Sequence, residues 1–380
     1  MMFAAAHSGR ITFLDGLRGI AALAVVVHHM SMAVVEELNR YGEHFLHELF
    51  GYGALGVDIF FILSGFVIAM TLDRQSVTGR FAACFMIRRS LRLDPPYLCS
   101  LALVIAITYA SIAIGAQLPT PTLPQLAAHV FYLQNILGYK DLNPVNWTLC
   151  LEIQFYLVLV LSLALLRKVF SDSGTAALLQ QRSVIIGFAA LALVSAAVHG
   201  DYIEIPIPHL FIAQWYQFFL GALTYWCRRG YLPHRWVLIY VVVVFGISLS
   251  GKPNAGDPVA ALTAAMLLTM STNRVLNSAP LQFLGRISYS LYLIHVPIGW
   301  AGIAFIARFV QNDSPWYAIS LGLMGVAMSL IAAWMLYFFV EAPSVALSRR
   351  VGDKCSARAS AAAAVAVPTP VATKSEASSG

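Results

Sequence analysis

The sequence predicts an all-α polytopic membrane protein with about ten transmembrane helices and with both termini in the cytoplasm. Of its 380 residues, 59% are hydrophobic and only 11% are charged, whereas soluble domains carry about 25% charged residues. The apolar residues also form blocks of roughly 15 to 22, a length that crosses the hydrocarbon core of a bilayer. A chain with so few charges cannot cover a water-exposed surface of ordinary composition, which excludes a typical soluble protein.

Ten apolar blocks are candidate spans, and most are bounded by charged or turn-forming residues. An additional short apolar stretch at 124–135 is predicted to be interfacial or re-entrant, because it is too short to cross a bilayer. The ten spans are 18–36, 53–72, 97–116, 151–166, 184–198, 209–227, 236–250, 258–271, 288–307 and 316–340.

The basic residues give the orientation. With the N-terminus in the cytoplasm, only Arg40, Lys140, Lys252 and Arg308 of the 24 lysines and arginines fall on the outer side. Cytoplasmic loops of membrane proteins carry an excess of Lys and Arg. This distribution supports both the number of spans and the orientation, and it explains the net charge of +6 without a nucleic-acid partner.

Three regions follow from this topology: a cytoplasmic N-terminus at 1–17, a membrane domain at 18–345 and a low-complexity cytoplasmic tail at 346–380. From about 353 the tail is rich in Ala, Ser, Pro and Thr, a composition that favours disorder. The five cysteines are scattered and predict buried apolar side chains rather than a disulfide framework or a metal site. They are Cys84, Cys99, Cys150, Cys227 and Cys355.

The first span, RGIAALAVVVHHM, contains ionisable residues in an apolar setting. Arg18 and His29 are 11 residues apart, so they share one helical face about 16 Å apart along the axis, whereas His28 is rotated about 100° from His29. An ionisable group at mid-depth is costly unless it faces a cavity or a partner. His29 therefore either bonds to a neighbouring helix or performs chemistry.

The second span, GVDIFFILSGFVI, places Asp58 at a depth near that of His29. A carboxylate there could orient and polarise the imidazole. The alternative is a structural pair with a histidine or an arginine. Ser64 and Gly65 favour close helix packing over a nucleophilic role.

The segment RRSLRLDPPYL precedes the third span on the cytoplasmic side. Arg88, Arg89 and Arg92 fall on overlapping helical faces. Guanidinium groups bind phosphates through bidentate hydrogen bonds, so this cluster could hold a polyanion. The alternative is that these arginines only fix the orientation of the chain.

Two later segments carry further candidate residues. In NPVNWTLCLE, Trp147 suits the outer interface, and Glu152 enters the fourth span, where it could orient a hydroxyl or neutralise a charge. In SYSLYLIHVP, His295 is a second intramembrane histidine, open between a site and a scaffold role. Glu341 ends the last span, where it could snorkel to the interface.

Together these motifs resemble the acyltransferase-three family of integral-membrane O-acyltransferases, which includes O-acetyltransferases of bacterial surface glycans. The resemblance lies in LDGLRGIAALAVVVHH, GVDIFFILSGFVI, RRSLRLDPPYL, WTLCLE and SYSLYLIHVP, which occur in family order from about 12 to 345. The chain departs from the family in the residues before its double proline and in Thr148, where serine is common. It also lacks the soluble esterase-like domain of some members.

The resemblance implies transfer of an acyl group, often acetyl, from cytoplasmic acyl-CoA to a hydroxyl of a glycan or its lipid-linked precursor, in the bacterial inner membrane. His29 is the expected catalytic residue, acting either as a base or as the acyl carrier, and Asp58 is expected to hold its ring. Arg18 and the cluster of Arg88, Arg89 and Arg92 would bind the phosphates of coenzyme A.

The other expected site residues are Glu152 for catalysis and Trp147, Tyr289 and His295 for substrate binding. We expect no metal and no permanently bound cofactor. The competing hypotheses are a transporter or flippase with an intramembrane proton relay and a non-catalytic scaffold for polysaccharide assembly.

Overall fold

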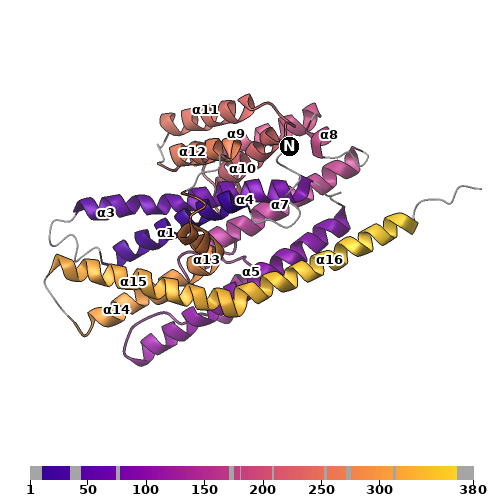
Figure 1. The fold of residues 1–380 in the computed structure, drawn as a ribbon. Helices are drawn as coiled ribbons and strands as arrows, with labels where there is room; N and C mark the ends of the chain where they lie inside the picture. The colour runs from indigo at the N-terminus through magenta and orange to yellow at the C-terminus, as the bar shows by residue number, and fades with distance from the viewer. Residues whose placement is uncertain are drawn as a thin grey trace, which may run out of the picture.

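A computed structural model shows a bundle of helices, as predicted (Figure 1), and none of the residues that it describes lies in a strand. The structure describes residues 11–34, 44–73, 78–170, 175–179, 181–207, 209–251, 255–270, 275–310 and 314–365. Most of the predicted cytoplasmic N-terminus and the last part of the predicted tail lie outside these residues.

Six helical segments are long and apolar enough to cross a membrane, which supports an integral membrane protein. Every predicted span coincides with a helix, but several of these helices are shorter than a bilayer requires. The number of ten and the orientation of the termini therefore stay predictions. The six segments are Thr12–Ala33, Glu48–Asp73, Gly79–Ala113, Trp147–Val169, Ala279–Ala307 and Trp316–Cys355.

These segments contain most of the labelled helices. The first is α1 (Thr12–Ala33), and the second combines the end of α3 (His44–Gly51), η1 (Tyr52–Leu55) and α4 (Gly56–Asp73). They are followed by α5 (Gly79–Ala113) and α7 (Trp147–Val169). The fifth segment combines α13 (Ala279–His295), the π-helix η3 (Val296–Trp300) and α14 (Ala301–Ala307).

The shorter helices form a group of their own beside α4, seen at the top of Figure 1: α9 (Arg182–His199), α10 (Trp215–Arg228), α11 (Arg235–Ser250) and α12 (Gly256–Thr269). The short elements α8 (Thr175–Leu178) and η2 (Phe211–Ala213) lie in the connections. In α10 every residue before Arg228 is buried, so α10 is the core of this group.

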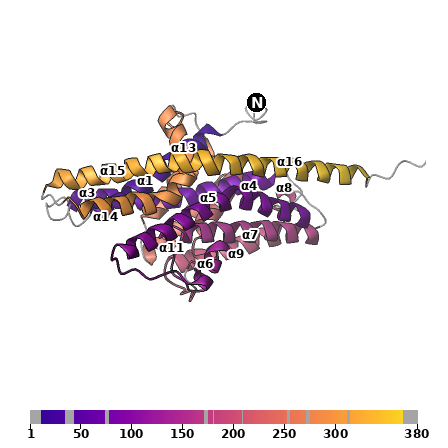
Figure 2. The same ribbon diagram turned by 90° about the horizontal axis from the view of Figure 1, so that it is seen from below.

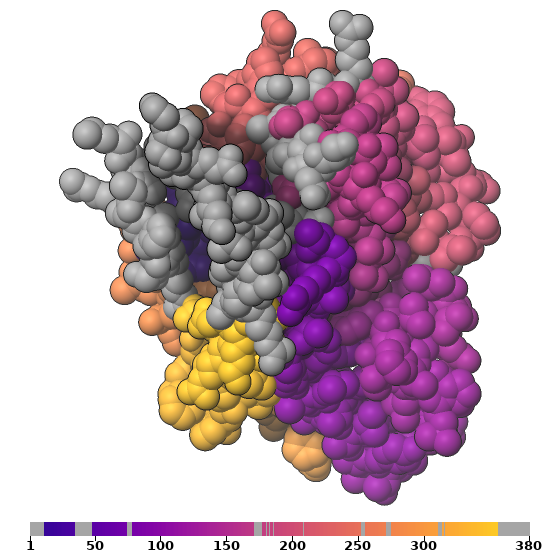
Figure 3. Space-filling view, turned by 90° about the vertical axis from the view of Figure 1, so that its right-hand side faces the viewer, coloured from indigo at the N-terminus to yellow at the C-terminus, as the bar shows by residue number. Residues whose placement is uncertain are grey.

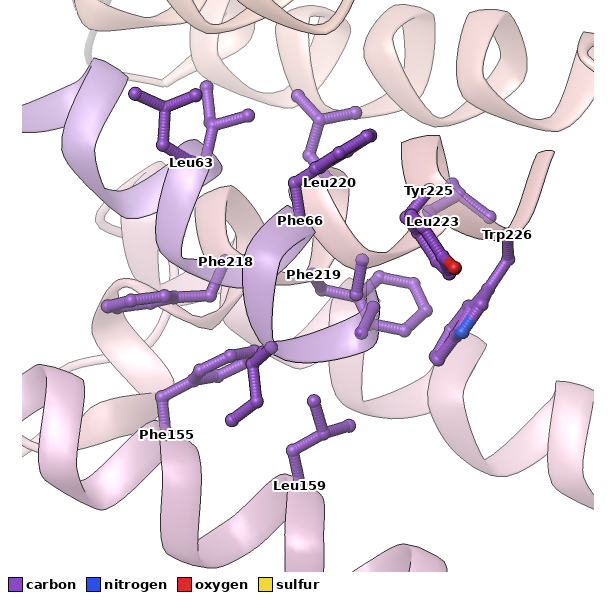
Figure 4. Packing of buried hydrophobic residues seen from close by; sticks show 14 of the residues in the cluster. Leu63, Phe66, Phe155, Leu159, Phe218, Phe219, Leu220, Leu223, Tyr225 and Trp226 are labelled. Atoms are coloured by element: carbon purple, nitrogen blue, oxygen red, sulfur yellow. The ribbon is translucent and has the colours of Figure 1, made fainter. Parts of the chain in front are cut away.

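Glycines allow α10 and α4 to pack with their backbones in contact. A side chain at Gly65 would collide with the carbonyl of Phe218, and one at Gly221 with the carbonyl of Ile62. Small residues permit such close approach of membrane helices, so the packing predicted for Gly65 is confirmed. The aromatic side chains of α10, together with Phe66 and Phe155, fill the space around this crossing (Figure 4).

The same device joins α1 to α13. A side chain at Gly19 would meet the carbonyl of Leu281, and one at Gly285 would meet the carbonyl of Asp15. The two helices that carry the predicted histidines are therefore held backbone to backbone, and small changes at this crossing would move both rings.

The helix that contains the third predicted span begins well before residue 97: α5 begins at Gly79, so the arginine cluster lies inside the helix rather than in a loop that precedes it. The prolines of LDPPY suggested a break, since proline removes a backbone donor and disfavours helix interiors. Here Pro95 and Pro96 are both helical. The turn before these prolines is bonded to α13, since the Tyr289 hydroxyl donates to the carbonyl of Leu93 (2.8 Å).

The last predicted span is also longer than expected. Helix α15 (Pro315–Leu336) continues through the π-helix η4 (Tyr337–Glu341) into α16 (Ala342–Val365), which forms one long rod in Figure 2. The expectation of disorder from about 353 is therefore wrong up to Val365. Alanine has the highest helix propensity. The Ala-rich segment that was predicted to be disordered therefore extends a helix.

The prediction of no disulfide is wrong as well. Cys84 of α5 and Cys355 of α16 are bonded, with 6.6 Å between their Cα atoms. Helices α5 and α16 lie side by side at this end of the molecule (Figure 3). Spacing rules cannot detect a pair 271 residues apart. Cys150 and Cys227 are buried, as predicted for apolar side chains, whereas Cys99 is exposed, so the prediction is wrong for that residue.

The apolar stretch at 124–135 forms the short helix α6 (Leu123–Val130) and the start of an irregular loop that leads to α7. His129 is fully buried there. Its Nδ1 donates to the carbonyl of Gln125 (2.8 Å), and its Nε2 accepts from the backbone N–H of Leu142 (3.1 Å). The neutral ring therefore joins α6 to the far end of the loop.

Acid should destabilise the protein through this ring. Burial lowers the pKa of His129, whereas a histidine in the unfolded chain has a pKa of about 6.5. The unfolded state therefore binds the proton first, so the free energy of unfolding falls as the pH decreases from about 6.5 toward the folded pKa. Thermal unfolding at pH values from about 7.5 to about 5.5 measures this loss of stability. In the His129→Asn variant the unfolding temperature should depend less on pH.

Candidate active site

Two histidines, one on α1 and one at the end of α13, are in contact with each other. Nδ1 of His29 lies 2.9 Å from the carbonyl oxygen of Val25, and Nδ1 of His295 lies 3.0 Å from that of Leu291. Because a carbonyl oxygen only accepts, both Nδ1 atoms carry the proton. Nε2 of His295 lies 3.2 Å from Nδ1 of His29 and accepts from it. Nε2 of His29 is thereby left unprotonated, as a base requires.

A proline next to His295 explains how this region is held. Pro297 lacks the N–H that would bond to the carbonyl of Leu293. That carbonyl instead accepts from the hydroxyl of Ser100 (2.9 Å) and from the side-chain amide of Asn143 (2.9 Å). The π-helix η3 also begins here, and π-bulges are frequent at functional sites. Helix α5 and the loop before α7 are therefore fastened one turn from His295.

The predicted pairing of Asp58 with His29 is wrong. Gln217 of α10 donates to the Asp58 carboxylate, and the ring of His29 is held by His295 instead. The sequence of α4 gives the reason. Gly56 faces the carbonyl of Ala21 on α1, and a residue two positions further is turned by about 200° to the opposite side.

Asp58 belongs to a separate polar cluster within the short-helix group. The Gln217 amide also donates to the hydroxyl of Tyr216 (2.8 Å), whose ring stacks on His199. Nε2 of His199 lies 3.0 Å from Asp257. This cluster joins α4, α9, α10 and α12, so Asp58 has a structural role, although its partner is a glutamine rather than the histidine or arginine of the alternative.

The second part of the candidate site is a group of cations and acids nearer the start of α1. Arg89 lies over the ring of Tyr156, with 4.7 Å from its guanidinium carbon to the ring centre. Tyr156 donates to the carboxylate of Glu152, and the hydroxyl of Ser64 donates to the same oxygen (2.8 Å). Glu152 is therefore oriented by two hydroxyls and linked through Tyr156 to the arginine cluster.

Glu341 completes this group. It is buried and accepts from the backbone N–H (3.2 Å) and the hydroxyl (2.6 Å) of Ser290. Arg18 and Arg92 lie within electrostatic range of its carboxylate. Two alternatives were open for Glu341, snorkelling to the interface or a role in the site, and its burial contradicts the first. An arginine of α1 and one of α5 therefore interact electrostatically with the same buried acid, and Arg89 interacts in the same way with Arg92.

Arg88 does not join its two neighbours. Its guanidinium lies against Gly352 of α16, where an added side chain would collide with it, and its carbonyl accepts from Ser348 (2.8 Å). The three predicted arginines therefore divide. Arg89 and Arg92 face the polar group, whereas Arg88 packs against α16.

The predicted substrate-binding aromatics Trp147 and Tyr289 contact other residues than the two histidines, whereas Tyr292, which was not predicted, packs beside His295. The hydroxyl of Tyr289 donates to the carbonyl of Leu93 on α5. The ring of Trp147 stacks on that of His209, with 4.9 Å between centres. Tyr292 shares a hydrogen bond of 2.7 Å with Thr148 of α7, and its ring centre is 5.9 Å from that of His295.

The arrangement joins two kinds of chemistry along α1. A neutral imidazole presents a basic nitrogen at one level, and guanidinium groups gather about three turns away. Within the described part of the chain, no group of three His, Cys, Asp or Glu residues could hold a metal ion.

Comparison with known proteins decides the family. The profile of the acyltransferase domain of the acyltransferase-three family matches residues 11–337. The chain belongs to this family. As a member, it is a membrane-bound enzyme that transfers acyl groups, so the family assignment disfavours the transporter and scaffold alternatives.

Several relatives of this acyltransferase are similar over most of its length. "Acyltransferase MdmB" of Streptomyces mycarofaciens is 26% identical over 90% of this chain and 93% of the relative. "Putative membrane-bound transacylase BcsY" of Komagataeibacter xylinus is 28% identical over 86% of this chain and 81% of the relative. "O-acetyltransferase OatA" of Staphylococcus aureus is 23% identical over 87% of this chain and 56% of the relative. No solved structure matches.

The sequence reasoning missed several residues of the acyltransferase site. Tyr156 was not singled out, although its spacing of four residues from Glu152 places both on one helical face. Ser64 was assigned to packing alone, and Ser290 was not considered. For Glu341, an acid inside an apolar span was itself the signal, since such residues usually pair within the bundle.

Proposed function

We propose that this acyltransferase moves an acyl group, most simply acetyl, from cytoplasmic acyl-CoA to a hydroxyl of a surface polysaccharide or its lipid-linked precursor, in the bacterial inner membrane. The observation that carries the proposal is the neutral His29. Its Nδ1–H donates to the Val25 carbonyl and to Nε2 of His295, which leaves a lone pair on its own Nε2. General bases of this kind contribute about 10²–10⁴-fold to rate.

In the direct reaction, Nε2 of His29 takes the proton of the acceptor hydroxyl while that oxygen bonds to the thioester carbonyl carbon. The carbon–sulfur bond then breaks, and the departing thiolate receives the proton from the imidazolium. In the two-step route, Nε2 itself bonds to the thioester carbonyl carbon, and the carbon–sulfur bond breaks to release the thiolate. The acceptor oxygen then bonds to that carbon, the carbon–nitrogen bond breaks to restore the imidazole, and the hydroxyl proton passes to the thiolate. His295 holds the ring in the correct tautomer in both routes.

The group of arginines would bind the acyl-CoA donor. Arg18, Arg89 and Arg92 can bind the phosphates of coenzyme A, because guanidinium groups match phosphate oxygens in bidentate geometry. Glu341 interacts electrostatically with two of these arginines, and its negative charge would offset part of their repulsion before the donor binds. Glu152 is held by Ser64 and by Tyr156, over whose ring Arg89 lies, so it can orient a reacting group near the cations.

The relatives support the finer points in part. One is named an O-acetyltransferase and another a transacylase, which favours acetyl transfer to oxygen. The glycan nature of the acceptor rests on the family resemblance. Donor and acceptor would reach the imidazole from opposite membrane faces, so the reaction needs a meeting point within the bundle.

The proposal is tested with purified protein in detergent and acetyl-CoA. Release of the coenzyme A thiol should depend on an added hydroxyl acceptor and on His29, whereas a transporter would leave the thioester intact. Mass spectrometry of surface glycans from cells with and without the protein should show one acyl mass on a defined sugar. Unchanged glycans together with intact thioester would refute the proposal.

His295 and Asp58 should behave differently when they are replaced. His295→Phe removes the acceptor of the His29 Nδ1 proton, and the loss of a buried hydrogen bond of about 1–3 kcal/mol predicts a kcat lower by about 10- to 100-fold. The pH dependence of kcat should shift at the same time, because the proton affinity of His29 changes.

Asp58→Asn keeps a partner for Gln217 and does not touch His29. It should change kcat by about threefold or less and leave the pH profile unaltered. A pH profile that shifts in the Asp58 variant but not in the His295 variant would restore the original pairing and contradict the geometry described here.

A further inference from the structure

A cavity far from the candidate active site lies between α9, α10 and α11. Its volume is about 190 Å³, and its lining side chains are hydrophobic. The floor is formed by small residues of α9 and large residues of α10: Ala192, Ala196, Phe219, Leu223 and Trp226. The hydroxyl of Tyr240, another lining residue, is used on the carbonyl of Tyr216 (2.9 Å).

The cavity opens to the outside of the bundle. Its floor is closed, since Trp226 is 1% exposed, whereas the rim residues Leu193 and Ile239 are 52% and 45% exposed. The rim lies between α9 and α11, two helices whose outer faces carry many exposed apolar side chains, including Ile186, Leu238 and Val242. Such a face is stable against lipid and costly against water.

Water is a poor occupant of this space. A buried water needs two to four polar partners, and an apolar cavity of about 150 Å³ in another protein stays dry and binds benzene. Hydrocarbon is therefore the chemistry that fits the lining. In a membrane protein with a lateral opening, the available hydrocarbon is a lipid chain.

The shape and charge of the region indicate how such a lipid would lie. The lining runs from Phe188 to Ala196 on α9, a rise of about 12 Å along the helix, so a chain would lie parallel to the helices. At one end, Trp236 lines the cavity and is exposed, and the neighbouring Arg235 is exposed as well. An aromatic residue and a cation together suit a headgroup region.

We propose that this cavity binds one hydrocarbon chain of an anionic phospholipid from the surrounding bilayer, with the phosphate of that lipid at Arg235. The bound chain fills the space behind α10. The other face of α10 packs against α4 through Gly65 and Gly221, and α4 carries Ser64, which orients Glu152. The lipid therefore supports the helix pair on which part of the active site is built.

Native mass spectrometry of the detergent-purified wild-type chain is the first test, with phosphatidylglycerol as the probe. One retained lipid per chain is expected. With a diazirine in its acyl chain, the probe should label peptides of α9 around 188–196 and of α11 around 236–244. Labelling confined to other helices, or no retained lipid, would overturn the proposal without any variant having to fold.

Ala192→Phe fills the floor of the cavity and should reduce the retained lipid by about tenfold, because the ring takes the volume that the chain needs. The rise in Tm that phosphatidylglycerol gives to the wild type should be lost with it. Ala190→Phe is the matched control, since Ala190 is exposed on the same helix and does not line the cavity. Equal lipid retention in both variants would contradict the proposed site.

Arg235→Gln tests the headgroup. It should abolish the preference for phosphatidylglycerol over phosphatidylcholine while the lipid chain is still retained. An unchanged preference in this variant would contradict the role of Arg235. If the wild type retains both lipids equally, the site binds only the hydrocarbon chain, and the proposal of an anionic headgroup is wrong. These measurements need no acyl transfer, so they stand apart from the proposed function.

Discussion

Replacing His29 by asparagine should lower kcat by about 10²–10⁴-fold, the range over which a positioned general base accelerates proton transfer. The amide of asparagine can still donate to the carbonyl of Val25, so the local helix keeps that bond. The lone pair that faces the substrate is lost, because asparagine has no basic nitrogen. Acyl appearing on carbohydrate, measured with labelled acetyl-CoA at saturating substrate, gives the rate.

The adjacent histidine provides the control. His28 is rotated by about 100° on the same helix, and its ring meets that of His29 edge-on, with 5.1 Å between centres. The bonds that hold the His29 ring are made with Val25 and His295, so His28→Asn should change kcat by about threefold or less. Both variants should retain the thermal stability of the parent to within a few degrees. An undiminished rate in the His29 variant, or a larger loss in the His28 variant, would show that the base is elsewhere.

The same pair of variants separates the two chemical routes. If His29 carries the acyl group, brief incubation with acetyl-CoA alone should add one acyl mass to the parent chain and to the His28 variant, but not to the His29 variant. If His29 is only a base, no variant gains mass without the acceptor. Intact-protein mass spectrometry distinguishes these outcomes.

The sequence predicted the relationships that lie along one helix. Arg18 and His29 share a face of α1 because helix geometry fixes the rotation of each residue. In the structure His29 contacts His295, and Arg18 interacts electrostatically with Glu341. Relationships between helices were less accessible. Asp58 was paired with the wrong histidine, since depth in the membrane can be estimated from sequence position but the face toward each neighbour cannot.

The length of the helices was missed for a related reason. Hydropathy sees the apolar part of a helix and ends it at charges or prolines, so the start of α5 and the whole of α16 were assigned to loops and tail. Tertiary contacts override such signals. Helices α5 and α16 are tied together by the Cys84–Cys355 bond and by the contact of Arg88 with Gly352, neither of which has a local signature.

The division of the arginine cluster gives the second large effect. Arg92→Gln should raise the KM for acyl-CoA by about 10- to 100-fold, because a hydrogen bond to a charged group contributes about 1.5–3 kcal/mol. The effect on kcat should be smaller, since the phosphates are remote from the thioester. Initial rates at varied acyl-CoA and fixed acceptor separate the two constants.

Arg88→Gln is the matched comparison, because the two arginines are one helical turn apart on α5 but Arg88 faces Gly352. Its KM for acyl-CoA should stay within about threefold of the parent. Arg92→Lys keeps the charge opposite Glu341 and loses only the planar fork, so it should fold normally and show an intermediate KM. Equal increases in KM for the Arg88 and Arg92 variants would mean that the donor binds along the outer surface of α5, and the assignment of its phosphates to the group around Glu341 would then be wrong.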